Sequence, residues 1–275
     1  MSSRKSIKSI KSKRGQALLV LIMLLATTIT IVLTTSFTSS TNTKNTKLEE
    51  DSQRALAAAE AGVSKALSSG SSQDIGTIVG VPGFQGTAEL SEVNTKRTFV
   101  SPTLSKDEEY TYYLSAYNVA GNTFSNPYNS TLTLYYESAN NCLDGALELS
   151  IVYDTAPSYK VKRFIADAGN LLGGPYPDPT NNIGQNLAGT VEGTSFNCQT
   201  TPIVLTSALF PNPKLLIVKS LFKSTQVGIV GDSTLPSQGR TITSEARSAS
   251  TGVTKKVVLF QSYPQLPSDF FVTRF

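Results

Sequence analysis

The chain has 275 residues, of which 39% are apolar and only 16% are charged, and it contains two cysteines but no histidine. These counts exclude Ser-His-Asp and Cys-His catalysis, histidine-ligated zinc or haem, and a zinc site made of four thiolates. The net charge of +4 arises at the N-terminus, where the first 15 residues hold six basic and no acidic side chains, so a basic footprint for nucleic acid is not expected on the rest of the chain.

The first predicted element is a membrane span. Residues 16–33 read QALLVLIMLLATTITIVL and carry no charge, and as a helix they rise about 27 Å, close to the apolar thickness of a bilayer. The basic flank before them should stay in the cytoplasm, so we expect the residues after the span to be exported. A cleavable secretory signal requires a small-x-small site after the apolar run, and TTSFTSSTNT offers none. An uncleaved signal anchor is one interpretation, and processing where Lys13-Arg14-Gly15 meets the apolar run is another.

An amphipathic helix is predicted to follow the span. Over residues 44–68, small and apolar side chains recur at helical spacing. The stripe consists of Leu48, Ser52, Ala55, Ala59, Val63 and Ala66, and it is widened by Leu56 and Leu67. We therefore predict a single helix from Gln16 to about Ser68, loosened in its threonine-rich stretch 34–46 and ended near Gly70. Its far half should lie against a globular domain, and its near half in lipid or among similar helices.

These N-terminal features together resemble the start of type IV pilins and of type II secretion pseudopilins. The resemblance rests on Lys13-Arg14-Gly15, on the run QALLVLIMLL, and on Ala57-Ala58-Ala59-Glu60-Ala61-Gly62, which is similar to the helix end of PilX-type minor pilins. It implies that a prepilin peptidase cleaves after Gly15 and methylates the new first residue, Gln16. It also implies that other pilin subunits, contacted through the N-terminal helix, and the inner-membrane assembly machinery are partners.

Val20 departs from the pattern of that family, which usually has glutamate at the fifth position after cleavage. In the family this carboxylate lies in an apolar bundle of helices, where burial costs several kcal/mol unless a cation meets it. The N-terminal amine of a neighbouring subunit is that cation. Valine cannot form the pair, so the sequence disfavours a bulk filament subunit and favours a minor subunit at or near the tip.

Residues 69–275 are predicted to form an exported β-rich domain, joined to the helix by a linker of Gly, Ser and Pro at 69–87. Alternating side chains predict strands at 109–117, 131–136, 147–153, 159–165, 215–221, 226–230, 240–246 and 255–261. Leu147, Leu149, Ile151 and Tyr153 should share one face of their strand. The stretch 168–202 is rich in Gly, Asn and Pro, and we interpret it as a long surface loop.

Cys142 and Cys198 bracket most of this stretch. Because exported compartments favour disulfides, we predict a bond between them. On the chain-entropy model the closed loop restricts the unfolded chain by about 4 kcal/mol. Two buried free thiols are the alternative.

No other motif points to chemistry. The acidic run Asp107-Glu108-Glu109 is interpreted as a solvated turn and not as a metal site. The tyrosines at 110, 112, 113 and 117 could form an adhesive surface, but strand packing explains them more simply. We assign no catalytic residue, metal or cofactor, and we do not expect an enzyme.

The sequence therefore predicts an α+β, pilin-like fold in which a long N-terminal helix packs on an antiparallel sheet. Its parts are a basic leader at 1–15, the helix at 16–68 with a transmembrane segment at about 16–36, and the exported domain at 69–275. The expected function is that of a minor type IV pilin-like structural subunit, held in the cytoplasmic membrane by one span with its N-terminus inside, and then assembled into a surface filament. A tip pseudopilin of a type II secretion system and a signal-anchored extracytoplasmic protein of another class, an enzyme included, are the alternatives.

Overall fold

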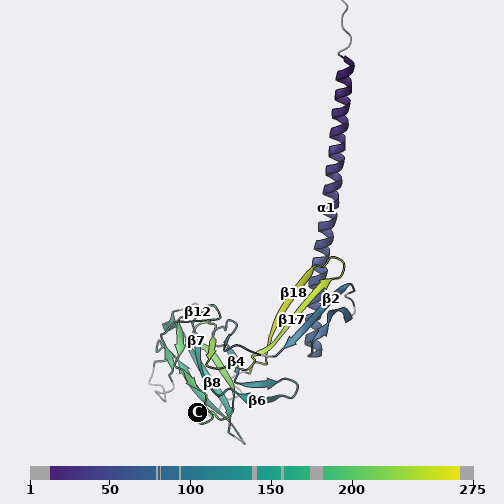
Figure 1. Cartoon of the computed structure of the whole chain (residues 1–275). Helices are drawn as coiled ribbons and strands as arrows, with labels where there is room; N and C mark the ends of the chain where they lie inside the picture. Colours follow the sequence, from purple (N-terminus) through teal and green to yellow (C-terminus); the bar gives the residue numbers. More distant parts are fainter. Residues whose placement is uncertain are drawn as a thin grey trace, which may run out of the picture. The chain divides into compact units, whose positions relative to one another are not determined.

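The computed structural model describes residues 13–78, 80, 82–92, 94–137, 141–155, 158–173 and 182–266. They belong to two compact units (Figure 1). The first unit comprises the chain up to Glu89 together with Thr243–Val258, and the second comprises Leu90–Ile242 together with the residues from Leu259 onward. The first 12 residues of the predicted leader lie outside the described residues.

The helix α1 runs without a break from Lys13 to Ser69. Its 57 residues extend about 85 Å at 1.5 Å per residue. The threonine-rich stretch 34–46, which the sequence predicted to be loosened, is helical throughout. Its hydroxyl groups donate to backbone carbonyls three or four residues earlier, at 2.8–3.0 Å for Thr34, Thr35, Thr38 and Thr41. The threonine hydroxyls therefore have hydrogen-bond partners within the helix, and the backbone hydrogen bonds of the helix are kept.

The C-terminal half of α1 packs on an antiparallel sheet with the strand order β1-β2-β17-β18. The strands are β1 (Gln73–Asp74), β2 (Phe84–Ser91), β17 (Gly239–Ser248) and β18 (Thr254–Ser262), and the short 3₁₀ helix η1 (Ile75–Thr77) follows β1. Figure 1 shows β2, β17 and β18 beside the lower end of the helix. The contact buries alanines of α1 against Ile75, Phe84 and Ala246. The coarse prediction of a long helix packed on an antiparallel sheet is therefore confirmed.

Gly62 allows α1 and the sheet to approach closely. A Cβ atom at this position would lie 2.5 Å from Oγ of Ser244, 3.2 Å from Cγ1 of Ile75 and 3.3 Å from Cβ of Ala88. Most of the neighbouring buried apolar residues of the helix are alanines, namely Ala55, Ala58, Ala59 and Ala66, and Val63 is the one larger side chain among them. This face of α1 is therefore flat, and the sheet packs directly on the helix backbone.

The buried face of α1 differs from the stripe that the sequence predicted. Leu48 and Leu56, which were placed in it, are 44% and 41% exposed, while Asp51 and Ala58 are buried. Periodicity identified the correct helix. The sheet approaches the helix so closely that small side chains form most of the buried face, and these two leucines lie on the exposed side.

The second unit contains two larger sheets whose buried side chains form one core. One sheet has the order β4-β15-β8-β9. The other has the order β10-β13-β7-β16-β3, in which β10 is Gly184–Gln185 and β13 is Cys198–Thr200, and β14 is also paired to β7. The strands are β3 (Thr98–Val100), β4 (Glu109–Tyr113), β7 (Thr131–Tyr136), β8 (Ala146–Asp154), β9 (Tyr159–Ala166), β14 (Ile203–Val204), β15 (Pro213–Leu221) and β16 (Gly228–Gly231). Leu147, Leu149 and Ile151 are buried in this core and Tyr153 packs against it, as the alternation predicted.

The stretch 168–202 is not only a surface loop, so this part of the sequence prediction was wrong. It contains β10 (Gly184–Gln185), β11 (Gly189–Val191), β12 (Thr194–Phe196) and β13 (Cys198–Thr200). The predicted linker at 69–87 likewise holds β1, η1 and the start of β2. The predicted strand at 109–117 is divided between β4 and β5 (Ser115–Asn118), and β5 pairs with β6 (Thr123–Pro127), which was not predicted.

Side chains of glutamine protect the outer edge of β4. The Gln238 amide accepts a hydrogen bond from the backbone N–H of Tyr113 and donates one to the carbonyl of the same residue, at 2.8 and 3.0 Å. Gln265 accepts from the N–H of Thr111 at 2.7 Å. These amides take the place of a neighbouring strand, so the edge is not left open to pair with another chain.

The substitution Gly62→Leu should destabilise the packing of α1 on its sheet by about 1–3 kcal/mol or more, because the side chain has no space to enter. Hydrogen–deuterium exchange of the full chain measures this as lost protection of β2 and of the C-terminal half of α1, which packs on it. Ala57→Leu, at an exposed position of the same helix, is the matched control and should leave protection unchanged. Equal protection in the two variants would contradict the close approach at Gly62.

Candidate functional site

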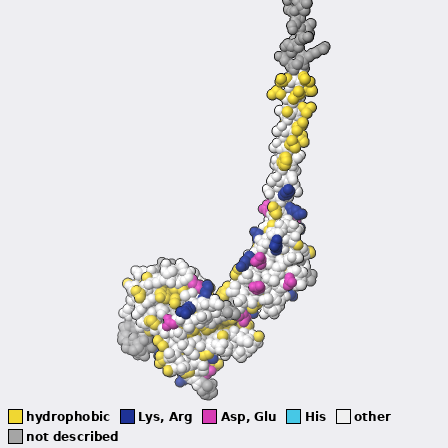
Figure 2. All heavy atoms as spheres, in the orientation of Figure 1, with side chains coloured by type: hydrophobic (Ala, Val, Ile, Leu, Met, Phe, Trp, Pro, Cys, Tyr) yellow, Lys and Arg dark blue, Asp and Glu magenta, His cyan; other side chains and the backbone are white. Residues whose placement is uncertain are grey.

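The N-terminal half of α1 is an uncovered apolar surface. From Leu18 to Leu33 the large apolar side chains are between 51% and 63% exposed, and Phe37 is 71% exposed. Figure 2 shows apolar side chains on the visible face of this segment, with charged side chains on the helix beyond its C-terminal end. Within the described residues this is the helix that is long and apolar enough to cross a membrane, and none of its apolar segment is buried.

The polar groups of this segment are satisfied within the helix. Thr27, Thr28 and Thr30 donate their hydroxyls to the carbonyls of residues 24–26 at 2.8–3.0 Å. In a bilayer, unsatisfied polar groups are costly, so a helix that satisfies both its backbone and its hydroxyls can enter lipid. The same hydroxyls can also contact a neighbouring helix at close range.

The residues that the pilin resemblance assigned to processing, and the position of the usual glutamate, lie in the first three turns of α1. Gly15 and Gln16 are within the helix backbone that begins at Lys13, and their side chains lie outside the described residues. Val20 is 56% exposed and belongs to the apolar surface. The structure thus places these three residues on one continuous helix, and their roles in processing stay predictions.

A carboxylate fixes the middle of α1 to the turn between β17 and β18. Oδ2 of Asp51 accepts hydrogen bonds from the hydroxyls of Ser248, Ser250 and Thr251, at 3.2, 3.1 and 2.7 Å. Helical spacing alone offers Lys47, four residues earlier, as a partner for Asp51. The hydroxyl groups are nearly 200 residues away in the chain, so helical spacing could not reveal them.

The hydrogen bond from Thr251 is the main cause that lowers the pKa of Asp51 below its ordinary value, and burial opposes it. The hydroxyls of Ser250 and Ser248 and the positive charge of Lys47 lower the pKa further. The contact therefore depends on the ionised carboxylate. The N-terminal half of α1 has no such anchor among the described residues, so the helix is held at one half only.

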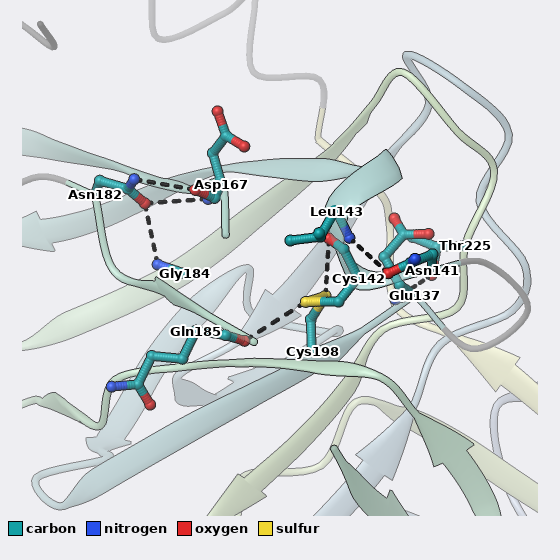
Figure 3. The surroundings of a disulfide bond; sticks show 10 residues. All are labelled: Glu137, Asn141, Cys142, Leu143, Asp167, Asn182, Gly184, Gln185, Cys198 and Thr225. Carbon is teal, nitrogen blue, oxygen red and sulfur yellow. Dashed lines mark hydrogen bonds between the residues drawn. A yellow bond between two sulfur atoms is a disulfide. The ribbon is translucent and has the colours of Figure 1, made fainter. Parts of the chain in front are cut away.

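The predicted disulfide is present in the second unit. Cys142 opens the 3₁₀ helix η2 (Cys142–Asp144) and Cys198 opens β13, and their sulfur atoms are 2.05 Å apart. Both residues are buried, and the Asn141 side chain accepts a hydrogen bond from the N–H of Leu143 at 3.2 Å (Figure 3). The disulfide thus ties the turn before β8 to the sheet that contains β7.

Asn182 supports the opposite side of this region. Its side chain accepts from the N–H groups of Asp167 and Gly184 and donates to the carbonyl of Asp167, all at 3.1 Å (Figure 3). It therefore connects the end of β9 to β10. This region is a structural joint, and the described residues contain no group of three or more Cys, Asp or Glu placed to hold a metal ion.

The tyrosines considered as an adhesive surface are mostly internal. Tyr110, Tyr112 and Tyr113 are buried, and burial is the main cause that raises the pKa of Tyr110 to about 12. Only Tyr117 is partly exposed, where it packs against Phe124 and Tyr263. Strand packing therefore accounts for this cluster, as the sequence favoured.

No family model matches the chain. No curated protein and no solved structure matches it either. We therefore infer the role of α1 from its two halves: the N-terminal half holds the uncovered apolar segment from Leu18 to Leu33, and the C-terminal half is packed on an antiparallel sheet.

The contact between Asp51 and the β17–β18 turn should weaken in acid. Because the pKa of the folded form is depressed, the stabilisation is present above the ordinary pKa of aspartate, about 3.9, and is lost as the pH falls through the lower folded value. Hydrogen exchange of the turn, corrected for intrinsic rates, should therefore show less protection at about pH 3 than at about pH 6. Asp51→Asn should abolish that difference and Glu50→Gln should retain it; a difference that survives in Asp51→Asn would argue against the contact.

Removal of the disulfide by the double substitution Cys142→Ala/Cys198→Ala should lower the free energy of unfolding of the second unit by about 2–5 kcal/mol. Urea unfolding followed by near-ultraviolet circular dichroism of the buried tyrosines measures it. Mass spectrometry of the non-reduced native protein should also show one linked peptide. The bond would be refuted if both thiols could be alkylated in native protein.

Proposed function

We propose that the chain is a minor type IV pilin-like structural subunit, which a prepilin peptidase processes and which then assembles into or at the tip of a surface filament. The observation that carries this proposal is the division of one unbroken helix. Its N-terminal half is apolar and uncovered, and its C-terminal half is packed on a folded unit. A plain membrane anchor needs only the first half, and it does not need that half to continue rigidly into a folded domain.

The mechanism is assembly without covalent chemistry on a substrate. Cleavage after Gly15 removes the six basic residues, and Gln16 becomes the methylated first residue. The apolar half of α1 then leaves the lipid and joins a core of similar helices. This transfer exchanges lipid contacts for helix–helix packing, so it involves no large change in solvation. The partners are the peptidase, the helices of other pilin subunits, and the assembly machinery of the inner membrane.

Val20 supports a place at or near the tip of the filament. A subunit with valine at this position buries no carboxylate in the helix core. It therefore does not need the N-terminal amine of a neighbouring subunit, and a subunit at the tip can lack that neighbour. Its apolar surface at this position is continuous with Leu19 and Leu21. The same feature favours the second candidate function, a tip pseudopilin of a type II secretion system. In both cases the β-rich part of the chain, residues 69–275, lies outside the cytoplasmic membrane.

Processing after Gly15 distinguishes a pilin-like subunit from a signal anchor. Sequencing of the native protein's N-terminus should find Gln16 as the first residue. Gly15→Leu should leave membrane insertion intact, because the apolar run and the positive flank are unchanged. Cleavage should stop, since the added Cβ and side chain prevent close approach to the scissile bond. The retained basic leader should then keep the variant in the membrane and out of filaments, because its charges cannot enter an apolar bundle cheaply.

A native chain that keeps its basic leader, or one that is cleaved well after Leu33, would remove the pilin-like interpretation. It would leave a signal-anchored or a secreted protein. Replacement of Lys8 by Gln is a suitable control, because it changes the leader without changing the cleavage position, and processing should continue.

A further inference from the structure

A small pocket of mixed character lies within the second unit. It has a volume of about 190 Å³ and receives side chains from the end of β2, from β3, from the β11–β12 turn, and from the start of β17 and the end of β18. At about 30 Å³ for each water molecule, this volume holds roughly six waters. The pocket is therefore suited to a single small ring and is too small for most extended ligands.

One wall of the pocket is aromatic. Phe99 and Phe260 have ring centroids 5.7 Å apart at an interplanar angle of 48°, and Phe99 also contacts the buried rings of Tyr110 and Tyr112. Phe260 is 45% exposed. Phe99 is thus fixed by the core, while Phe260 presents part of its ring to a ligand.

The pocket lining also holds a carboxylate, that of Glu192, in an unusual backbone conformation. Glu192 and Gly193 form the two-residue turn between β11 and β12, and both have positive φ, 49° and 84°. Such turns favour Asn or Asp followed by Gly, and glutamate is unusual in this conformation. Its Oε1 accepts a hydrogen bond from Oγ1 of Thr98 at 2.9 Å and lies 3.3 Å from Nζ of Lys96. No described residue donates to Oε2, which leaves it for a ligand.

The loops around the pocket are held in place by other polar groups. The Asn94 side chain accepts from the N–H of Lys96 at 2.9 Å and donates to the carbonyl of Leu235 at 3.1 Å. Gln238 is committed to the edge of β4. The amides thus form the frame of the pocket, and the side chains of Lys96, Glu192 and Thr241 remain to contact a ligand.

We propose that this pocket binds one pyranose-sized sugar residue. The C–H face of a sugar ring packs on an aromatic face, because its weakly positive hydrogens meet the negative π surface. Its hydroxyl groups both donate and accept, so they fit a carboxylate and an ammonium placed side by side. The paired charges of Lys96 and Glu192 cancel, which disfavours a strongly anionic or cationic ligand. The inference does not depend on the pilin-like role, since it uses only residues of the second unit.

The test uses the full chain in phospholipid nanodiscs, with no sugar-based detergent. Saturation-transfer NMR is recorded with glucose, galactose, mannose, N-acetylglucosamine and N-acetylgalactosamine. At least one should receive saturation, and Phe260→Ala should weaken its binding about tenfold or more. Tyr159→Ala, which removes an exposed aromatic ring from β9, should not change it.

Glu192→Gln provides a second variant at an exposed turn, where misfolding is not expected. It keeps an acceptor for Thr98 but removes the charge, so the affinity should fall about fivefold. Glu245→Gln, at an exposed position outside the pocket, is its control. The proposal is overturned if none of the five sugars receives saturation, or if Phe260→Ala and Glu192→Gln both bind as the unchanged chain does.

Discussion

The close contact between the second half of α1 and its sheet is the constraint on which the rest of the structure depends. On the helix side it consists mainly of small side chains, with Gly62 at the point of nearest approach and alanines around it, packed against Ile75 and Phe84 of the sheet unit. Such an interface buries little apolar area for each residue, so it depends on fit and on specific polar contacts more than on bulk hydrophobic burial. Asp51 supplies the polar contact, where three hydroxyls converge on one oxygen.

This contact determines what the first half of α1 can do. A helix fixed along its C-terminal half extends its other half as a stiff rod whose direction is set by the folded unit. Because the helix satisfies its own backbone and threonine hydroxyls, the rod can exist in lipid or among other helices without further partners. A pilin-like role needs both properties in one element, which is why the division of α1 carries the proposal.

Much of this architecture could be predicted from the sequence, and the exceptions have physical causes. The apolar helix could be predicted because its run of residues carries no charge over a length that spans a bilayer. The strand at 131–136 could be predicted because its side chains alternate between a buried and a less buried face. The strands β10 to β13 have two or three residues each, too few to show a periodic pattern, so their local sequence resembles a loop. Of these strands, β13 also depends on pairing with the distant β7. The exposure of Leu48 and Leu56 and the partners of Asp51 depend equally on residues far along the chain.

A photoreactive amino acid placed at Leu24, in the middle of the uncovered apolar surface, tests the central claim most directly. If α1 enters a core of similar helices, irradiation of sheared surface filaments should link this position to the N-terminal helix of another subunit, as identified by mass spectrometry. In the Gly15→Leu variant the same position should link only to lipid. Lipid adducts alone in the native chain, with none of the chain in the filament fraction, would contradict the account.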